Sequence, residues 1–319
     1  MKTIEWGFLI VNYLFLGGLS AGIFFVSALA TYLQDKDQPA YPRIARYGAM
    51  MAPWPVALGS FLLIFDLGNW YRFYKLFLHF RWESPMSIGS WLLLVFNGIT
   101  FLYFYAWLPE EKRRGFFSKI PKRLSFLKRF DVDLSRWRRL LAMAGFPFSI
   151  GVGIYTGVLL GAVQARPFWN TNLVAQMFLF SALSTGCATL ILALSINRKD
   201  LDFRQIRFLY TLDICFILLE FFIVLPYLIH GELSVLAVQE ALELILGGPF
   251  TLTFWVLFMG LGLLLPLVIE LWEMKPALFS RAAIHHNKPL ASGAAVLVLM
   301  GGYLLRYIFV YAGQISAFK

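Results

Sequence analysis

Eight long apolar segments constrain the fold of this chain more than any other feature of its sequence. Each is longer than the roughly 20 residues that an α-helix needs to cross a hydrocarbon core of about 30 Å. The sequence therefore predicts an all-α fold, a polytopic membrane helical bundle with eight transmembrane helices. The predicted spans are 6–33, 45–68, 86–108, 140–163, 172–196, 207–230, 249–272 and 289–313.

The composition agrees with this prediction. Of the 319 residues, 59% are hydrophobic and only 14% are charged, whereas soluble domains carry about a quarter charged residues. No segment between the spans is large enough to fold alone, so residues 1–319 are expected to form a single integral membrane domain. A division into two four-helix halves, joined by a short turn at 164–171, stays open. The first apolar segment is too long for a signal peptide and is expected to be an uncleaved helix.

Basic residues are distributed unevenly between the two sets of loops. One set carries 21 Lys and Arg residues and the other carries 6. By the positive-inside rule, this predicts that both termini lie on the outer, periplasmic side of a prokaryotic inner (cell) membrane. The net charge of +10 then indicates membrane lipid as the partner of the basic loops and excludes nucleic acid. The basic loops are 34–46, 109–139, 197–207 and 273–288.

Ionisable side chains inside the spans are the first functional candidates, because each costs roughly 2.5–3.5 kcal/mol at a helix centre. Asp213 and Glu220 are seven residues apart, which places them on one helix face, about 10 Å apart along the axis. With Asp66 and Arg306 they are the predicted catalytic residues, forming a proton relay or a water-filled path. The alternative is a structural carboxylate–arginine pair. Glu270 is expected nearer a helix end.

The span before the turn at 164–171 carries a second candidate. Gly153, Gly157 and Gly161 recur every four residues, so they line one helix face and allow another backbone to approach closely. The hydroxyl of Tyr155 in this span can donate a hydrogen bond and a proton to a quinone carbonyl. The alternative is a hydrogen bond to a neighbouring helix.

Three further residues complete the predicted quinone-binding set. Asn12 lies in the outer part of the first span and can hold a head group or pin one helix to another. Arg166 and Trp169 lie in the turn, where they would shape the mouth of the pocket or the docking surface. Each has an equally good alternative outside the site: Arg166 can be an arginine that reaches to the membrane interface, and Trp169 can be a residue of the aromatic belt.

The sequence offers no ligand set for an electron-carrying metal centre. A membrane b-type haem needs axial histidines that face each other inside the bundle. The two cysteines, Cys187 and Cys215, lie singly in spans and are expected to be small buried hydrophobes. We therefore expect no haem, iron–sulfur cluster or catalytic metal in this chain, and electrons would pass to or from a partner subunit. The histidines fall in loops or at a span end: His79, His230, His285 and His286.

Several pieces of the sequence resemble the polysulfide-reductase membrane-subunit family, also called NrfD-like. They occur in the family's order along the whole chain, and the pieces with SPMSxGSW and YTG…PFWN are the most diagnostic. The pieces are NYLFLGGLSAG (12–22), DLGNWYRFYKLFLHFRWESPMSIGSWLL (66–93), YTGVLLGAVQARPFWNT (155–171), LFSALSTG (179–186), GGPFTLTFW (247–255) and LRYIFVYAGQ (305–314).

This resemblance implies a haem-free quinone-reactive subunit of a respiratory oxidoreductase complex. Its partners would be a ferredoxin-type [4Fe–4S] subunit and, beyond it, a molybdopterin catalytic subunit or a multihaem cytochrome. The family's quinone-contacting tyrosine corresponds to Tyr155, and its polar contact in the first helix lies near Asn12. The family's intramembrane acids correspond to Asp66, Asp213 and Glu220, while Arg306 falls in the last matching piece.

The sequence therefore predicts a quinol/quinone oxidoreductase subunit of an anaerobic electron-transport chain. Menaquinone or ubiquinone would bind near the outer face, and turnover would be accompanied by proton movement. Two other classes stay open. A structural anchor would only tether a periplasmic redox enzyme, and a secondary transporter would use its buried carboxylates to bind a cation or substrate. The transporter class predicts broken helices in matched halves, which the sequence does not show.

Overall fold

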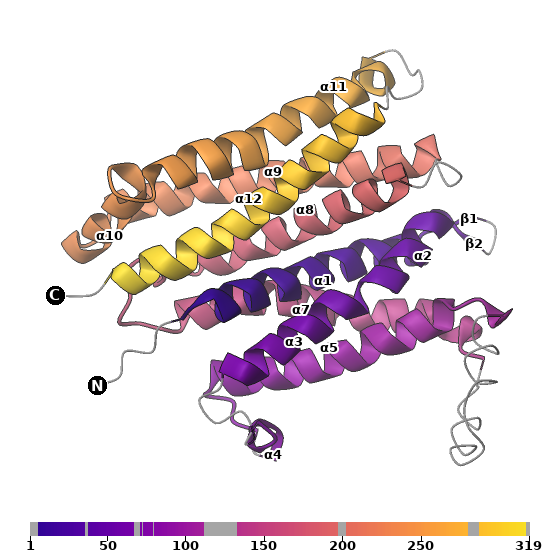
Figure 1. Cartoon of the computed structure of the whole chain (residues 1–319), viewed down its shortest axis with the longest axis horizontal. Helices are drawn as coiled ribbons and strands as arrows, with labels where there is room; N and C mark the ends of the chain where they lie inside the picture. The colour runs from indigo at the N-terminus through magenta and orange to yellow at the C-terminus, as the bar shows by residue number, and fades with distance from the viewer. Residues whose placement is uncertain are drawn as a thin grey trace.

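The computed structural model of the chain is a bundle of long helices that share one direction (Figure 1). Within the part of the chain that the structure describes, eight helices are long and apolar enough to cross a membrane. The predicted all-α polytopic membrane fold is therefore confirmed. The described residues are 6–35, 38–66, 71, 73–78, 80–111, 133–196, 202–279 and 287–316.

The eight spans lie close to their predicted positions. The largest differences are five residues. The fourth span begins at Ser135, where the prediction was 140, and the seventh ends at Ala277, where the prediction was 272. The spans are built from α1 (Phe8–Tyr32), α2 and α3 (Pro42–Met51 and Pro53–Asp66), α5 (Pro85–Trp107), α7 (Arg138–Gly161), α8 (Leu173–Ile196), α9 (Phe203–Glu232), η5 and α11 (Thr253–Leu264 and Leu265–Phe279) and α12 (Lys288–Ile315).

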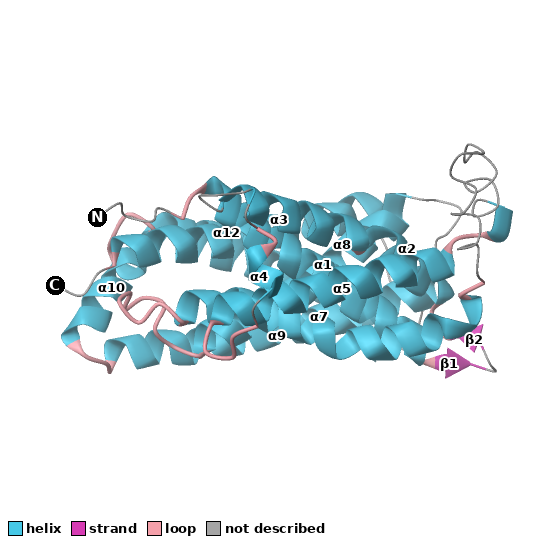
Figure 2. Ribbon diagram, turned by 90° about the horizontal axis from the view of Figure 1, so that it is seen from below, coloured by secondary structure: helices cyan, strands magenta, loops and turns pink. Residues whose placement is uncertain are grey.

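The bundle has two ends, which differ in their loops. Both ends of the described chain lie at one of them, together with the turn at 162–172; we call this end the terminus face (Figures 1 and 2). The opposite end, the basic-loop face, carries the short β1–β2 hairpin and the α7 and α12 N-termini. Most of the longest predicted basic loop, 109–139, lies outside the described residues, since the structure does not describe 112–132. His79, His285 and His286 also lie outside them.

Short elements decorate both faces. At the basic-loop face, β1 (Gln34–Asp35) pairs antiparallel with β2 (Gln38–Pro39), and η3 (Ser135–Trp137) leads into α7. At the terminus face, α10 (Leu236–Leu246) follows α9. The short helix α4 (Lys75–Leu78) lies between α3 and α5 in the chain.

Two spans depart from regular α-helix. The second span is interrupted at Ala52, directly before Pro53, and Ser20 of α1 donates a hydrogen bond of 2.5 Å to the Ala52 carbonyl. A neighbouring helix thus satisfies a backbone group at the proline break, as a membrane interior requires. The seventh span begins as a π-helix, η5, that runs to the residue before Leu265 and Pro266. This π-helix was not predicted from the sequence.

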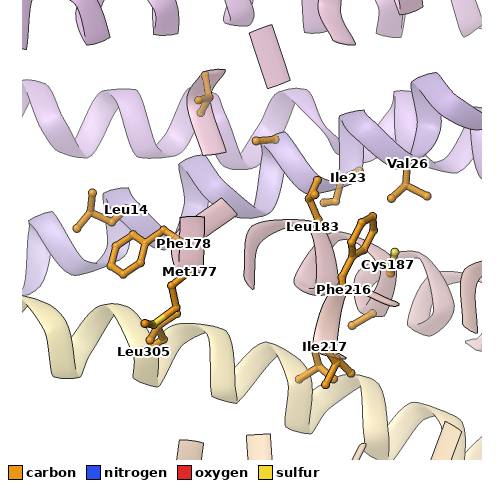
Figure 3. Close-up of a cluster of buried hydrophobic side chains, with 14 of the residues drawn as sticks. Leu14, Ile23, Val26, Met177, Phe178, Leu183, Cys187, Phe216, Ile217 and Leu305 are labelled. Atoms are coloured by element: carbon orange, nitrogen blue, oxygen red, sulfur yellow. The ribbon is translucent and has the colours of Figure 1, made fainter. Parts of the chain in front are cut away.

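α1 and α8 form the centre of the bundle, where they pack against each other. Gly22 and Gly186 lie backbone to backbone, and an added Cβ on either would overlap the other helix. Small residues at such crossings let membrane helices approach closely. Around the crossing, buried apolar side chains of α1, α8 and α9 meet, among them Ile23, Leu183 and Phe216 (Figure 3).

The glycine face of α7 packs on α8, as predicted. An added Cβ at Gly157 would meet the backbone of Ala175, and one at Gly153 would meet Leu179. Outward-facing positions carry large apolar side chains, including exposed Phe222, which suits contact with lipid. The cysteines differ: Cys187 is buried, but Cys215 is exposed, so the prediction of a buried Cys215 is wrong. It lies on an outward face of α9, where the bundle has no neighbouring described helix to cover it.

Candidate functional site

Tyr155 lies in the terminus-face half of α7, six residues or about 9 Å before the helix ends. Its side chain is 6% exposed. The phenol presses on Gly89 of α5, because a Cβ added to Gly89 would overlap the end of the Tyr155 ring. Glycine at position 89 therefore opens the space that the phenol occupies, and α5 fixes where its hydroxyl lies.

Tyr13 of α1 is the partner of Tyr155. The side chain of Tyr13 is fully buried, and the two phenols interact. The Tyr13 hydroxyl has no well-formed hydrogen bond to another described residue. The site is thus a pair of facing phenols between α1, α5 and α7. A buried hydroxyl without a partner is unusual, since leaving one unsatisfied costs about 1–3 kcal/mol.

Tyr13 was not predicted from the sequence, which pointed instead to its neighbour, Asn12. Asn12 donates a hydrogen bond of 2.7 Å to the carbonyl of Phe8 and interacts with Tyr303 of α12. Successive helix residues point about 100° apart, so Asn12 and Tyr13 face different helices. Tyr13 precedes Gly17 by four residues and so shares its helix face, and Gly17 packs on α7; which helix this face meets could not be read from the sequence.

Arg166 and Trp169 fasten the turn at 162–172 to the end of α12. Arg166 donates hydrogen bonds to the carbonyls of Gln314 and Ser316, and Trp169 donates one of 2.6 Å to the Phe309 carbonyl. The Trp169 ring also stacks on Trp6, with ring centroids 5.1 Å apart. None of these contacts reaches Tyr155, so the structure does not bring Arg166 and Trp169 into the phenol site.

A cavity of about 230 Å³ lies between α3, α5 and the segment around α4, and neither phenol is among its lining residues. Ser90 lines it and directly follows Gly89; Ser60 lines it and follows Gly59, which packs on the backbone of α1 at Tyr13. Asn97 also lines the cavity, and its side chain donates hydrogen bonds to Ser60 Oγ of α3 (3.1 Å) and to the Leu93 carbonyl of its own helix (2.8 Å). The remaining lining residues are mainly apolar: Leu63, Ile64, Phe73, Phe77, Leu93 and Leu94.

The predicted intramembrane acids of α9 are both buried. Asp213 and Glu220 are less than 2% exposed, which confirms that they share the inward face of the helix. Asp213 accepts a hydrogen bond of 2.6 Å from Ser184 of α8. Glu220 interacts with Ser181 of α8 and with Arg306 of α12. Each acid is therefore linked to α8 by a serine hydroxyl, and the two serines are three residues apart along that helix.

Arg306 is fully buried, and it donates hydrogen bonds to α8 and to its own helix. Its guanidinium donates to Ser181 Oγ (2.6 Å), to the Gly302 carbonyl (2.8 Å) and to the Phe178 carbonyl (3.0 Å). None of these hydrogen bonds reaches a carboxylate. Its charge faces Glu220 across the shared Ser181, so the two charged groups are joined by a hydroxyl between them.

One prediction about acid positions is wrong. Glu270 was expected near a helix end, but α11 continues to Phe279 and Glu270 is buried against Asp213. Asp66 belongs to α3, and residues 67–70 lie outside the described residues, so its position within the second span stays a prediction.

One more acid was not singled out from the sequence. Glu273 of α11 is fully buried, accepts a hydrogen bond from the hydroxyl of Tyr210, and accepts another of 3.0 Å from the backbone N–H of Asn287. Its spacing of three residues from Glu270 places both on one helix face, which is the signal that was available. Among the described residues, no group of three or more His, Cys, Asp and Glu side chains is arranged to hold a metal ion.

Comparisons with known proteins cover almost the whole chain. The family described as "Polysulphide reductase, NrfD" matches residues 1–317. The chain is 30% identical to the C subunit of polysulfide reductase from Wolinella succinogenes, over 98% of this chain and 95% of that protein. It is 28% identical to protein NrfD of Escherichia coli, over 99% and 96%. It is 25% identical to the Hdr-like menaquinol oxidoreductase integral membrane subunit of Archaeoglobus fulgidus, over 85% of this chain and 63% of that protein.

Proposed function

The chain belongs to the NrfD polysulphide reductase family, and from that membership we propose that it is the quinone-reactive membrane subunit of a respiratory reductase complex. Its relatives are named as subunits of polysulfide reductase and of a menaquinol oxidoreductase. Quinol would bind at the phenol site near the terminus face. Its oxidation to quinone releases two electrons and two protons, and the electrons would pass to an iron–sulfur partner subunit.

The observation that carries this proposal is the buried pair of phenols, Tyr155 and Tyr13, between α1, α5 and α7. A quinone head group needs a largely apolar pocket with few, well-placed polar groups, and α5 also lines an apolar cavity in which Asn97 is such a polar group. Because Gly89 fixes the Tyr155 ring, its hydroxyl is positioned before substrate binds. A positioned hydroxyl can donate a hydrogen bond to a quinone oxygen or receive a quinol proton as it passes its own proton on.

The intramembrane acids suit a second task, the movement of protons away from this site. Asp213 and Glu220 lie on one face of α9, and Arg306 stands beside Glu220. Buried ionisable groups within spans are costly and mark proton relays or structural pairs. We propose the relay for Asp213 and Glu220, and a positioning role for Arg306, because its hydrogen bonds hold α12 to α8.

The remaining predicted residues take other roles in this proposal. Arg166 and Trp169 hold the terminus-face turn to the end of α12. That turn then offers a firm surface for a ferredoxin-type [4Fe–4S] subunit, which would in turn serve a molybdopterin subunit or a multihaem cytochrome. Asn12 and Asp66 lie near the same face. The proposed orientation places the terminus face on the periplasmic side of the inner membrane, as the charge distribution favours.

The test is quinol oxidation by the purified native complex with Tyr155→Phe, which removes one hydroxyl and keeps the ring against Gly89. Tyr103→Phe is the matched control, because Tyr103 is also fully buried but bonds Thr31 at the opposite end of α5. We expect Tyr155→Phe to assemble normally and to lose about 10²-fold in turnover, within the usual range for a positioned acid–base group. Full turnover in the assembled variant would favour a structural anchor instead.

A further inference from the structure

The acids Asp213, Glu270 and Glu273 and the phenol of Tyr210 form a cluster in the basic-loop half of the bundle. We propose that Asp213 and Glu270 hold one proton between them and exchange it with the basic-loop face through Tyr210 and Glu273. This inference rests on the proposed function, because it names the face with which the intramembrane acids exchange protons. Several features of the cluster and its surroundings support it.

The first feature is the contact between the two carboxyl groups. Asp213 of α9 and Glu270 of α11 interact directly, although both are buried. Asp213 Oδ1 accepts from Ser184, but Asp213 Oδ2 and Glu270 Oε2 are buried without a hydrogen-bond donor in the described chain. Carboxylates in contact repel each other unless one of them carries a proton.

A cation does not satisfy this pair. Among the described residues, the buried positive charge nearest to the pair along the bundle is Arg306, and its hydrogen bonds go to Ser181 and to the carbonyls of Gly302 and Phe178. Two ionised carboxylates that share one buried site are strongly unfavourable, and such pairs hold a proton in common. A single proton supplies the missing donor and removes one of the two buried charges.

Tyr210 and Glu273 continue the cluster toward the basic-loop face. Tyr210 precedes Asp213 by three residues on α9, and Glu273 follows Glu270 by three on α11. Because these helices run in opposite directions, both steps lead the same way, by about 4.5 Å. The Tyr210 hydroxyl donates to Glu273, so the two helices are joined again one turn further on.

The proposed proton route ends at the start of α12. Glu273 also accepts a hydrogen bond of 3.0 Å from the backbone N–H of Asn287. Asn287 is the residue before α12 begins at Lys288, at the basic-loop face. Glu273 is itself fully buried, and this hydrogen bond joins the cluster to the start of α12.

Toward the terminus face, apolar side chains follow the pair on α9. Ile217 and Phe216 lie between Asp213 and Glu220 in sequence, and both pack in the buried core (Figure 3). Glu220 is about 10 Å further along the helix. The Asp213–Glu270 pair is therefore the nearer of the two to the basic-loop face, and we expect it to exchange protons with that face first.

The proton itself is tested by infrared spectroscopy on the full chain in lipid nanodiscs, without quinol or electron partners. We expect a carboxylic-acid C=O band at neutral pH that shifts in deuterated water and that disappears in Asp213→Asn and in Glu270→Gln. Glu240→Gln is the matched control, because Glu240 is an exposed acid of α10. The inference is overturned if the wild type lacks the band, or if the band survives both substitutions.

The route is tested by the rate at which this band exchanges on transfer to deuterated water. Tyr210→Phe and Glu273→Gln each remove one link, and we expect either to slow exchange at least 10-fold. An unchanged exchange rate in folded samples of both variants would refute the route. Because neither measurement involves quinol turnover, these failures are distinguishable from a failure of the Tyr155→Phe test, which bears on the quinol site alone.

Discussion

Replacing Gly89 by alanine is the sharpest test of how the phenol site works. The heavy atoms that most crowd an added Cβ at this position all belong to the Tyr155 ring or its hydroxyl. The ring must therefore move by roughly 2 Å to restore a normal carbon–carbon contact of about 3.5–4.0 Å. These closest contacts do not involve the backbone of another helix, so α5 itself is expected to remain in place.

The expected cost is mainly catalytic. A misplacement of about 1 Å can reduce a rate about 10²-fold, so Gly89→Ala should lower quinol turnover by at least that factor. The accompanying overpacking costs roughly 1–3 kcal/mol of stability, which the assembled complex should tolerate. The assay is steady-state quinol oxidation by the purified complex, with kcat and KM determined separately.

Gly98→Ala is the matched control, because Gly98 lies on the same helix and an added Cβ there meets nothing within 4 Å. We expect it to be silent. The double variant Gly89→Ala/Tyr155→Phe should be hardly slower than Tyr155→Phe alone, since both changes act on one hydroxyl. Wild-type turnover in Gly89→Ala, at normal assembly, would refute the claim that the position of this phenol matters.

Two further predictions concern the helix contacts that hold the bundle. Gly22→Ala forces a methyl group into the backbone of α8 at Ala182. We therefore expect loss of the assembled subunit in membranes, measured by immunoblot and size exclusion. A normal yield would show that α1 and α8 do not approach so closely. Arg306→Met leaves the Phe178 carbonyl and Ser181 without their donor. It should lower the free energy of unfolding by about 3–5 kcal/mol, measured by denaturant titration in micelles. An unchanged unfolding midpoint would contradict the positioning role of Arg306.

The features that follow from local pattern were predictable from the sequence. The spans follow from the length of apolar runs, and the contact of Gly153 and Gly157 with α8 follows from their spacing of four. The common face of Asp213 and Glu220 follows from their spacing of seven in the same way. Each of these inferences needs only the geometry of one helix.

The features that depend on which helix lies next to which were not predictable. α1 is apolar nearly all round, so its pattern does not reveal that Tyr13, and not Asn12, faces α7. Trp169 bonds a carbonyl 140 residues away in sequence, and no local signal indicates that partner. Glu270 was misplaced because α11 continues to Phe279, beyond the predicted end of the span at 272, and its contact with Asp213 of α9 has no local signal either.

The most direct test of the central claim is to map where a quinone binds. The intact complex would be labelled with a photoreactive azidoquinone, and the labelled peptides identified by mass spectrometry with and without competing quinol. We expect labels that quinol suppresses on α1, α5 and α7 around Tyr13, Gly89 and Tyr155. Labels confined to another surface, such as the groove of Tyr303 and Tyr307 beside α1, would contradict this claim.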